Sequence, residues 1–174
     1  MLKAFRVAAI ATASLLCLGA GAALADFELG MVIKSTTNPY YNATLQGAQM
    51  AASEVGGKVE NWGPTQSTAT AQIDIINSLA NRRISAIAVA PNDAAAVVPA
   101  MKRAAQLGIP VITFDADSDP EGRKFYVNSA TTEAIGTYGA KRLAEEMGMK
   151  GEIAIVSAQP TSANQNAWIK AFRA

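Results

Sequence analysis

One pattern recurs along the sequence, a short apolar run followed by a longer segment with helical periodicity. Each strand–helix unit takes roughly 27 to 30 residues. The runs Ile87–Ala90, Val111–Phe114 and Ile153–Val156 are apolar on both faces. Such runs are typical of parallel strands that helices cover on both sides. The alternation therefore predicts an α/β fold built on a doubly wound parallel sheet.

The same periodicity places the elements and suggests two lobes. It predicts strands over 28–34, 58–62, 85–90, 110–115, 124–127 and 152–158. It predicts helices over 41–55, 68–82, 93–107 and 131–147, with another from Asn164 onward. The run at 124–127 completes the first sheet, and the units after it are too few to close a second core. We therefore expect an N-terminal lobe over 26–128 and an incomplete start of a C-terminal lobe over 129–174, as in a piece of a longer protein.

The first 25 residues have the three parts of a secretory signal. Lys3 and Arg6 supply the charged start, and Val7–Ala22 is apolar. That apolar stretch of about 16 residues is shorter than the roughly 20 that a membrane-spanning helix needs. Small residues lead up to Ala25. We therefore expect export from the cytoplasm and cleavage after Ala25.

Composition excludes several classes of function for the exported chain. The single cysteine, Cys17, lies in the expected signal, and the sequence has no histidine. Disulfides, the usual zinc and copper sites and a nucleophile–histidine pair are therefore excluded. Removing Lys3 and Arg6 leaves 13 basic against 14 acidic residues, a net charge of −1. No basic surface for nucleic acid is indicated, and we expect no metal, no cofactor and no nucleic-acid partner.

Polar and aromatic residues follow the predicted strands at the edge where a ligand would bind. In an open α/β sheet, ligands lie outside the carboxyl ends of the strands. A carboxylate there accepts hydrogen bonds from neighbouring hydroxyls, a lysine or amide donates to others, and a tyrosine ring covers the C–H face of a sugar. The candidate ligand-binding residues are Lys34, Asn38, Tyr40, Tyr41, Asp115, Asn164 and Gln165.

Most of these residues also have a purely structural interpretation. Asp115 can cap a turn, Lys34 can end a strand in solvent, and the two tyrosines can pack at the start of a helix. For Asn92 and Asp93 the capping interpretation is the favoured one. Trp168 fits better in a core or a domain interface than in a binding site.

Several segments together carry a resemblance to a known family. They are Lys34–Tyr41, Asn61–Thr65, Val89–Asp93, Val111–Asp115 and Pro160–Asn166, in this order behind an export signal. The set resembles the ribose-type periplasmic binding proteins, the sugar receptors of bacterial ABC importers. Within them it is most similar to the rhamnose-binding and autoinducer-2-binding branch. The resemblance covers the whole exported chain but only about the first half of such a protein.

The resemblance implies two lobes joined by a hinge near Asn128 and Ser129, with a ligand bound between them. It also implies that closure of the lobes presents the loaded receptor to an importer permease, without chemistry on the ligand. The two tyrosines take the positions of the family's stacking aromatics. The family's ligand-binding positions fall on Lys34, Tyr40, Tyr41, Asp115, Asn164 and Gln165.

Two departures from the family pattern narrow the expected ligand. Ribose receptors carry an arginine where this sequence has Ala116, and autoinducer-2 receptors carry an aspartate where it has Asn164. The first departure argues against ribose, and the second argues against autoinducer-2 and favours a neutral sugar of the rhamnose kind. The expected function is the periplasmic substrate-binding component of an ABC importer, which is not an enzyme. The alternatives are a sugar or autoinducer-2 receptor that docks on a chemoreceptor, and a repressor-type effector domain, which would begin with a basic helix-turn-helix.

Overall fold

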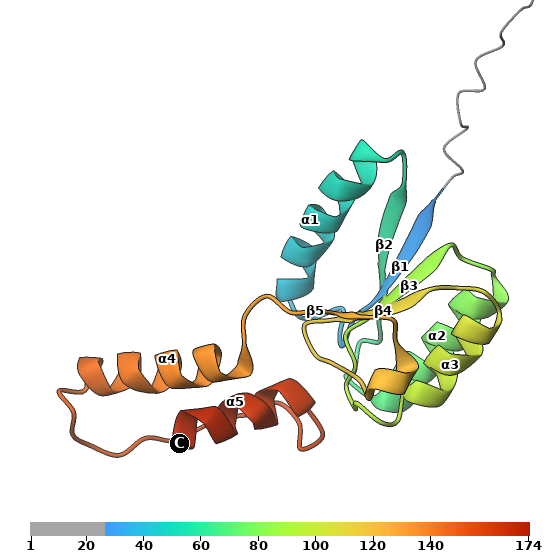
Figure 1. Ribbon diagram of the computed structural model, residues 1–174. Helices are drawn as coiled ribbons and strands as arrows, with labels where there is room; N and C mark the ends of the chain where they lie inside the picture. The colour runs from blue at the N-terminus through green and yellow to red at the C-terminus, as the bar shows by residue number, and fades with distance from the viewer. Residues whose placement is uncertain (1–26) are drawn as a thin grey trace, which may run out of the picture.

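A computed structural model describes residues 27–174. Its centre is a sheet of five parallel strands in the order β2-β1-β3-β4-β5, seen edge-on in Figure 1. The strands are β1 (Glu28–Val32), β2 (Lys58–Trp62), β3 (Ala86–Val89), β4 (Val111–Phe114) and β5 (Tyr126–Val127). The helices are α1 (Tyr40–Glu54), α2 (Ala69–Asn81), α3 (Val98–Gln106), α4 (Thr132–Glu146) and α5 (Ala163–Arg173), with a 3₁₀ turn at Pro120–Gly122. The predicted parallel α/β sheet is confirmed.

Alternation along the strands divides the core into two layers. On one face Val32, Ile87 and Val89 are fully buried beneath α2 and α3. On the other face Met31, Ile33 and Phe114 belong to the same buried cluster as Tyr41 of α1. Figure 1 shows α1 on one side of the sheet and α2 and α3 on the other. This double cover explains why the strands are apolar runs in the sequence.

One predicted helix begins later than expected. The periodicity predicts a start at Asp93, but α3 begins at Val98. Pro99 lies in the first turn of α3, where its missing N–H breaks no helical hydrogen bond. In a helix starting at Asp93 the proline would stand in the interior, where it disrupts the ladder. Asp93 caps the preceding turn instead, accepting hydrogen bonds from the N–H groups of Ala95 and Ala96 at 3.1 and 3.0 Å.

The strand predicted over 152–158 is absent, and this prediction was wrong. All five strands of residues 27–174 belong to the one sheet, and 152–158 is exposed with no regular structure. A strand needs a hydrogen-bonded neighbour, and no second-lobe strand is available within the described residues. After β5 the chain forms a pair of helices, α4 and α5, which lie side by side away from the sheet in Figure 1. A Cβ placed on Gly136 would lie 2.5 Å from the Cβ of Ala171, so glycine permits their close approach.

Some expectations fall outside what the structure describes. The expected export signal, residues 1–25, precedes the described part of the chain. The lobe boundary near residue 128 stays a prediction. Between residues 27 and 174, no helix combines the length and apolar character that a bilayer crossing requires.

Candidate functional site

A buried glutamine fixes the strand ends that carry the site. Gln72 on α2 is fully buried. Its Nε2 donates to the carbonyls of Ile33 at 3.1 Å and Ala90 at 2.8 Å, and its Oε1 accepts from the N–H of Asn92 at 2.8 Å. These contacts join the chain just beyond β1 to the chain just beyond β3. In the order β2-β1-β3, this is the switch point where the chain crosses over, the usual ligand position of such sheets.

An ion pair lies at the centre of this edge. Lys34 Nζ is 3.1 Å from Asp115 Oδ2, and each side chain is only 14% exposed. The hydroxyl of Tyr41 donates to the same carboxylate oxygen at 3.0 Å. Lys34 follows β1, Asp115 follows β4 and Tyr41 belongs to the first turn of α1. The structure therefore brings together three of the predicted site residues from three separate elements.

The two tyrosines have different positions in the site. The Tyr41 ring is 1% exposed and packs edge-on against Phe114, with centroids 6.2 Å apart. Only its hydroxyl reaches the polar centre. Burial, followed by the charge of Asp115, raises the pKa of Tyr41 far above its usual value, so the hydroxyl keeps its proton as a donor. Tyr40 is 43% exposed, stands in a T-shaped contact with Tyr41 and lines the cleft, so its ring is the more accessible of the two.

The predicted residues after α4 approach the same point from the opposite side. Asn164 Oδ1 accepts from Lys34 Nζ at 3.2 Å, and its Nδ2 donates to the Asp115 carbonyl at 3.3 Å. Gln165 turns toward its own loop, where its Oε1 accepts from the Ser157 hydroxyl at 2.8 Å and the Ala158 N–H at 2.9 Å. Asn164 therefore belongs to the polar centre, whereas the Gln165 amide supports the loop before α5.

A cleft of about 270 Å³ lies around these groups. All seven predicted residues line it, including Asn38, whose Oδ1 also accepts from the Tyr40 N–H at 3.0 Å. Ser67, Asn92 and Gln159 line it too, although the sequence did not single out Ser67 or Gln159. The capping interpretation of Asn92 is incomplete, since its Oδ1 accepts from the Ser67 hydroxyl at 2.8 Å beside the cleft. Trp168 lines the cleft and also an apolar groove between α4 and α5.

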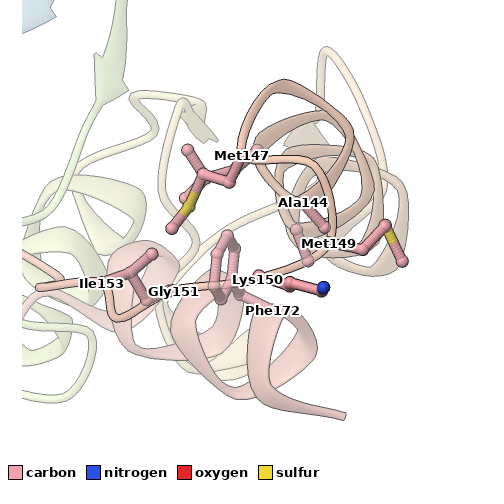
Figure 2. A pocket seen from close by; sticks show the side chains of 9 residues that line it. Ala144, Met147, Met149, Lys150, Gly151, Ile153 and Phe172 are labelled. Carbon is pink, nitrogen blue, oxygen red and sulfur yellow. The ribbon is translucent and has the colours of Figure 1, made fainter.

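A second hollow, shown in Figure 2, has a different character. It measures about 280 Å³ and is lined mainly by apolar side chains, among them Met147, Met149, Ile153 and Phe172. Lys150 is its single charged lining residue. It lies at the end of α4 away from the sheet, far from the carboxyl ends of the strands. A hydroxyl-rich ligand needs several donors and acceptors, which the first cleft has and this hollow lacks.

A second ion pair lies in the loop that follows Asp115. Arg123 Nε and Nη2 each lie 2.5 Å from an oxygen of Asp117, and the Thr113 hydroxyl donates to the same carboxylate at 2.6 Å. Burial alone would raise the pKa of Asp117. The hydrogen bonds from Arg123, Thr113 and the Ser118 N–H, with the Arg123 charge, outweigh burial and hold that pKa below its usual value. The pair therefore stabilises the fold in the ionised state of Asp117.

The lowered pKa of Asp117 sets the direction of a pH effect. A carboxyl of this kind contributes stability that is fully present above its unfolded-state pKa of about 3.9 and is lost as the pH falls through its folded-state pKa. We expect Asp117→Asn to lower the free energy of unfolding at neutral pH and to differ less from the parent at about pH 3. Urea unfolding at both pH values measures this. A difference that does not change with pH would contradict the assignment.

Comparison with known proteins identifies the family. Residues 29–174 match the family described as the periplasmic binding protein domain. The chain belongs to this family. The resemblance noted in the sequence is thereby confirmed, and the matched curated proteins are named as binding proteins rather than enzymes.

Members of the periplasmic binding protein family with known ligands are similar over most of this chain. The D-allose-binding periplasmic protein of Escherichia coli strain K12 is 26% identical over 153 residues, which is 83% of this chain and 49% of that protein. A solute-binding protein from Clostridium phytofermentas, solved with L-rhamnose, is 32% identical with a TM-score of 0.81, over 85% of this chain and 46% of its own. LsrB from Clostridium saccharobutylicum, in complex with AI-2, is 28% identical with a TM-score of 0.74. The match covers 84% of this chain and 47% of LsrB. The chain thus spans about half the length of these relatives.

Proposed function

We propose that this chain is part of the substrate-binding component of an ABC importer, located in the periplasm, and that it binds a neutral monosaccharide of the rhamnose kind. The observation that carries the proposal is the convergence of Lys34, Asp115, Tyr41 and Asn164 on one cleft. Membership of the periplasmic binding protein family supports it. Relatives solved with L-rhamnose and D-arabinose support a sugar as the ligand.

The chemistry of the cleft suits a sugar ring. Asp115 accepts from hydroxyl groups, Lys34 donates to them, and the Asn164 amide does both. Hydrogen bonds to charged groups contribute about 1.5–3 kcal/mol each, so three or four, less the costs of binding, reach a micromolar affinity near −8 kcal/mol. The exposed Tyr40 ring offers an apolar face for the C–H groups of the sugar.

The identities of two residues favour a rhamnose-like sugar over ribose. Ala116 stands where ribose receptors carry an arginine, and it is fully buried, so this position presents no charged side chain to a ligand. Asn164 keeps the second side of the cleft uncharged. The positive charge of Lys34 and the negative charge of Asp115 compensate each other. The cleft therefore has no net charge to attract an ion, and a ligand without net charge suits it best.

The second candidate is a signalling receptor for the same kind of ligand or for autoinducer-2. Similarity to the LsrB protein solved with AI-2 favours it. In that function the closed receptor docks on a chemoreceptor instead of a permease. Both functions share lobe closure around a bound ligand, which shifts the population toward the form that the membrane partner recognises.

A thermal-shift screen of the full-length protein tests the proposal. The panel contains L-rhamnose, D-arabinose, D-allose, D-ribose and autoinducer-2. A true ligand at 100 times its Kd should raise the free energy of unfolding by about 2.7 kcal/mol. We expect the largest rise with L-rhamnose. A folded protein whose melting temperature no compound raises would refute the sugar-receptor proposal, and a rise with autoinducer-2 alone would favour the second candidate.

A further inference from the structure

Asp115 stands at the centre of a very tight turn directly after β4. Its φ angle is +61°. The N–H of Ala116 donates to the carbonyl of Phe114 at 2.6 Å, which closes the turn over a single residue. A hydrogen bond of this span around a residue of positive φ is the rare, strained form of the γ-turn. Strain of this kind persists only where the surrounding structure holds the backbone in place.

The turn decides on which side of the sheet the carboxylate lies. Phe114 packs on the α1 side, in contact with the Tyr41 ring. In a regular strand the next side chain would point to the opposite face. Asp115 instead lies on the Tyr41 side, with its Oδ2 3.0 Å from the Tyr41 hydroxyl. The γ-turn therefore brings the carboxylate round to Lys34 and the cleft.

Hydrogen bonds among three side chains link the backbone before the turn to the backbone after it. These side chains belong to Thr113, Asp117 and Arg123, and we call the group the clasp. Thr113, fully buried, precedes the turn and donates to Asp117 Oδ1 at 2.6 Å. Asp117 follows the turn and is held by Arg123 through two hydrogen bonds of 2.5 Å. A two-point arginine–carboxylate contact fixes orientation as well as distance. The Asp117 and Arg123 side chains are 32% and 18% exposed, so solvent screens this pair only in part.

We propose that the clasp holds the γ-turn in its strained form and thereby positions Asp115 for ligand binding. The proposal rests on the proposed role of Asp115 as a ligand of the sugar. None of the three clasp residues lines the cleft, so they are positioning residues that act through Asp115. Without the clasp, the backbone at Asp115 can relax toward negative φ, and the carboxylate then turns away from Lys34.

The affinity test uses the full-length protein and calorimetry with L-rhamnose. We expect Arg123→Gln and the near-isosteric Thr113→Val each to weaken binding about tenfold, the size of a coupling between groups in contact. The matched control is Glu121→Gln. It removes the Lys102–Glu121 ion pair of the same loop, 3.1 Å long with both side chains largely exposed, and should leave affinity unchanged.

A double-mutant cycle separates positioning from general destabilisation. In an Asp115→Asn background, Arg123→Gln should cost little further affinity, because the carboxylate that it positions is already gone. Equal losses in both backgrounds would overturn the proposal. If Asp115→Asn itself leaves affinity unchanged, the assignment of the site fails. If it weakens binding while neither clasp variant does, only the positioning by the clasp fails.

A crystal structure of the clasp variant provides a readout without ligand. In Arg123→Gln we expect the φ angle of Asp115 to become negative and its distance from Tyr41 to lengthen. An unchanged γ-turn would overturn the proposal even if L-rhamnose proves not to bind. Should Arg123→Gln fail to fold, Thr113→Val, which removes one hydroxyl, takes its place in both experiments.

Discussion

Asp115→Asn is expected to weaken sugar binding by about 100-fold while the protein stays folded. The change removes the negative charge of the carboxylate that accepts hydrogen bonds from the sugar hydroxyls. Each hydrogen bond to a charged group contributes about 1.5–3 kcal/mol to binding. It also removes the ion-pair partner of Lys34 at 3.1 Å, although Lys34 keeps its hydrogen bond to Asn164. Asparagine is the suitable replacement because it tolerates positive φ better than alanine does. Calorimetry with L-rhamnose on the full-length protein measures the loss.

The matched control for this change is Asp119→Asn. Asp119 belongs to the same loop, but it is exposed and does not line the cleft. Its replacement changes net charge by the same amount, so it should leave both affinity and melting temperature unchanged. If the two variants bind equally well, long-range charge rather than contact explains any effect, and the assigned site is wrong.

Gln72→Leu is expected to produce the largest loss of stability, about 3–5 kcal/mol in the free energy of unfolding. Leucine matches the size of the buried side chain but leaves the carbonyls of Ile33 and Ala90 and the N–H of Asn92 without partners. Each unsatisfied buried group costs about 1–3 kcal/mol. Chemical denaturation monitored by circular dichroism measures the change.

A second glutamine provides the comparison. Gln49 on α1 is exposed and makes one hydrogen bond, from its Nε2 to the Val59 carbonyl at 3.3 Å. Gln49→Leu should therefore cost at most about 1 kcal/mol. Similar losses in the two variants would mean that Gln72 does not bridge the strand ends. We also expect Gln72→Leu to weaken binding, because Lys34 follows one of those ends directly.

The sequence predicted the elements of the sheet well because its signals are local. Buried parallel strands leave apolar runs, and the helices between them leave a regular period, so the sheet and its helices were predictable. The late start of α3 was also readable in principle, since Pro99 cannot stand deep in a helix. The strand predicted over 152–158 failed for another reason. A strand depends on a neighbour that its own apolar pattern does not report.

The sequence predicted a set of residues that line one cleft in the structure, but it did not predict their geometry. The rule that ligands bind at the carboxyl ends of parallel strands led to Lys34 and Asp115, which lie in contact. It did not reveal that the Tyr41 ring is buried and that only its hydroxyl reaches the cleft. Gln72 was missed, although a glutamine on the apolar face of a helix is a usable signal for buried hydrogen bonding.

The γ-turn could not be read from the sequence at all. The residue type of Asp115 is only a weak signal, because positive φ is uncommon even for aspartate, which adopts it a few times more often than other residues do. The spacing of Thr113, Asp117 and Arg123 becomes meaningful only when the chain is folded back on itself. Such contacts across a loop depend on tertiary structure, which local patterns do not encode.

The ion pair between Lys34 and Asp115 also bears on which molecules the cleft rejects. A sugar acid or a sugar phosphate could approach Lys34, but its negative charge would then lie close to the Asp115 carboxylate. At a separation of about 4 Å and an effective dielectric constant of about 20, the repulsion from Asp115 and the attraction to Lys34 are each about 4 kcal/mol, so the two largely cancel. For a cationic amino sugar the attraction to Asp115 and the repulsion from Lys34 cancel in the same way. A cleft whose opposite charges stand 3.1 Å apart thus gives an ion of either sign no net attraction to offset the loss of its water shell, a cost that the neutral sugar proposed as the ligand does not meet.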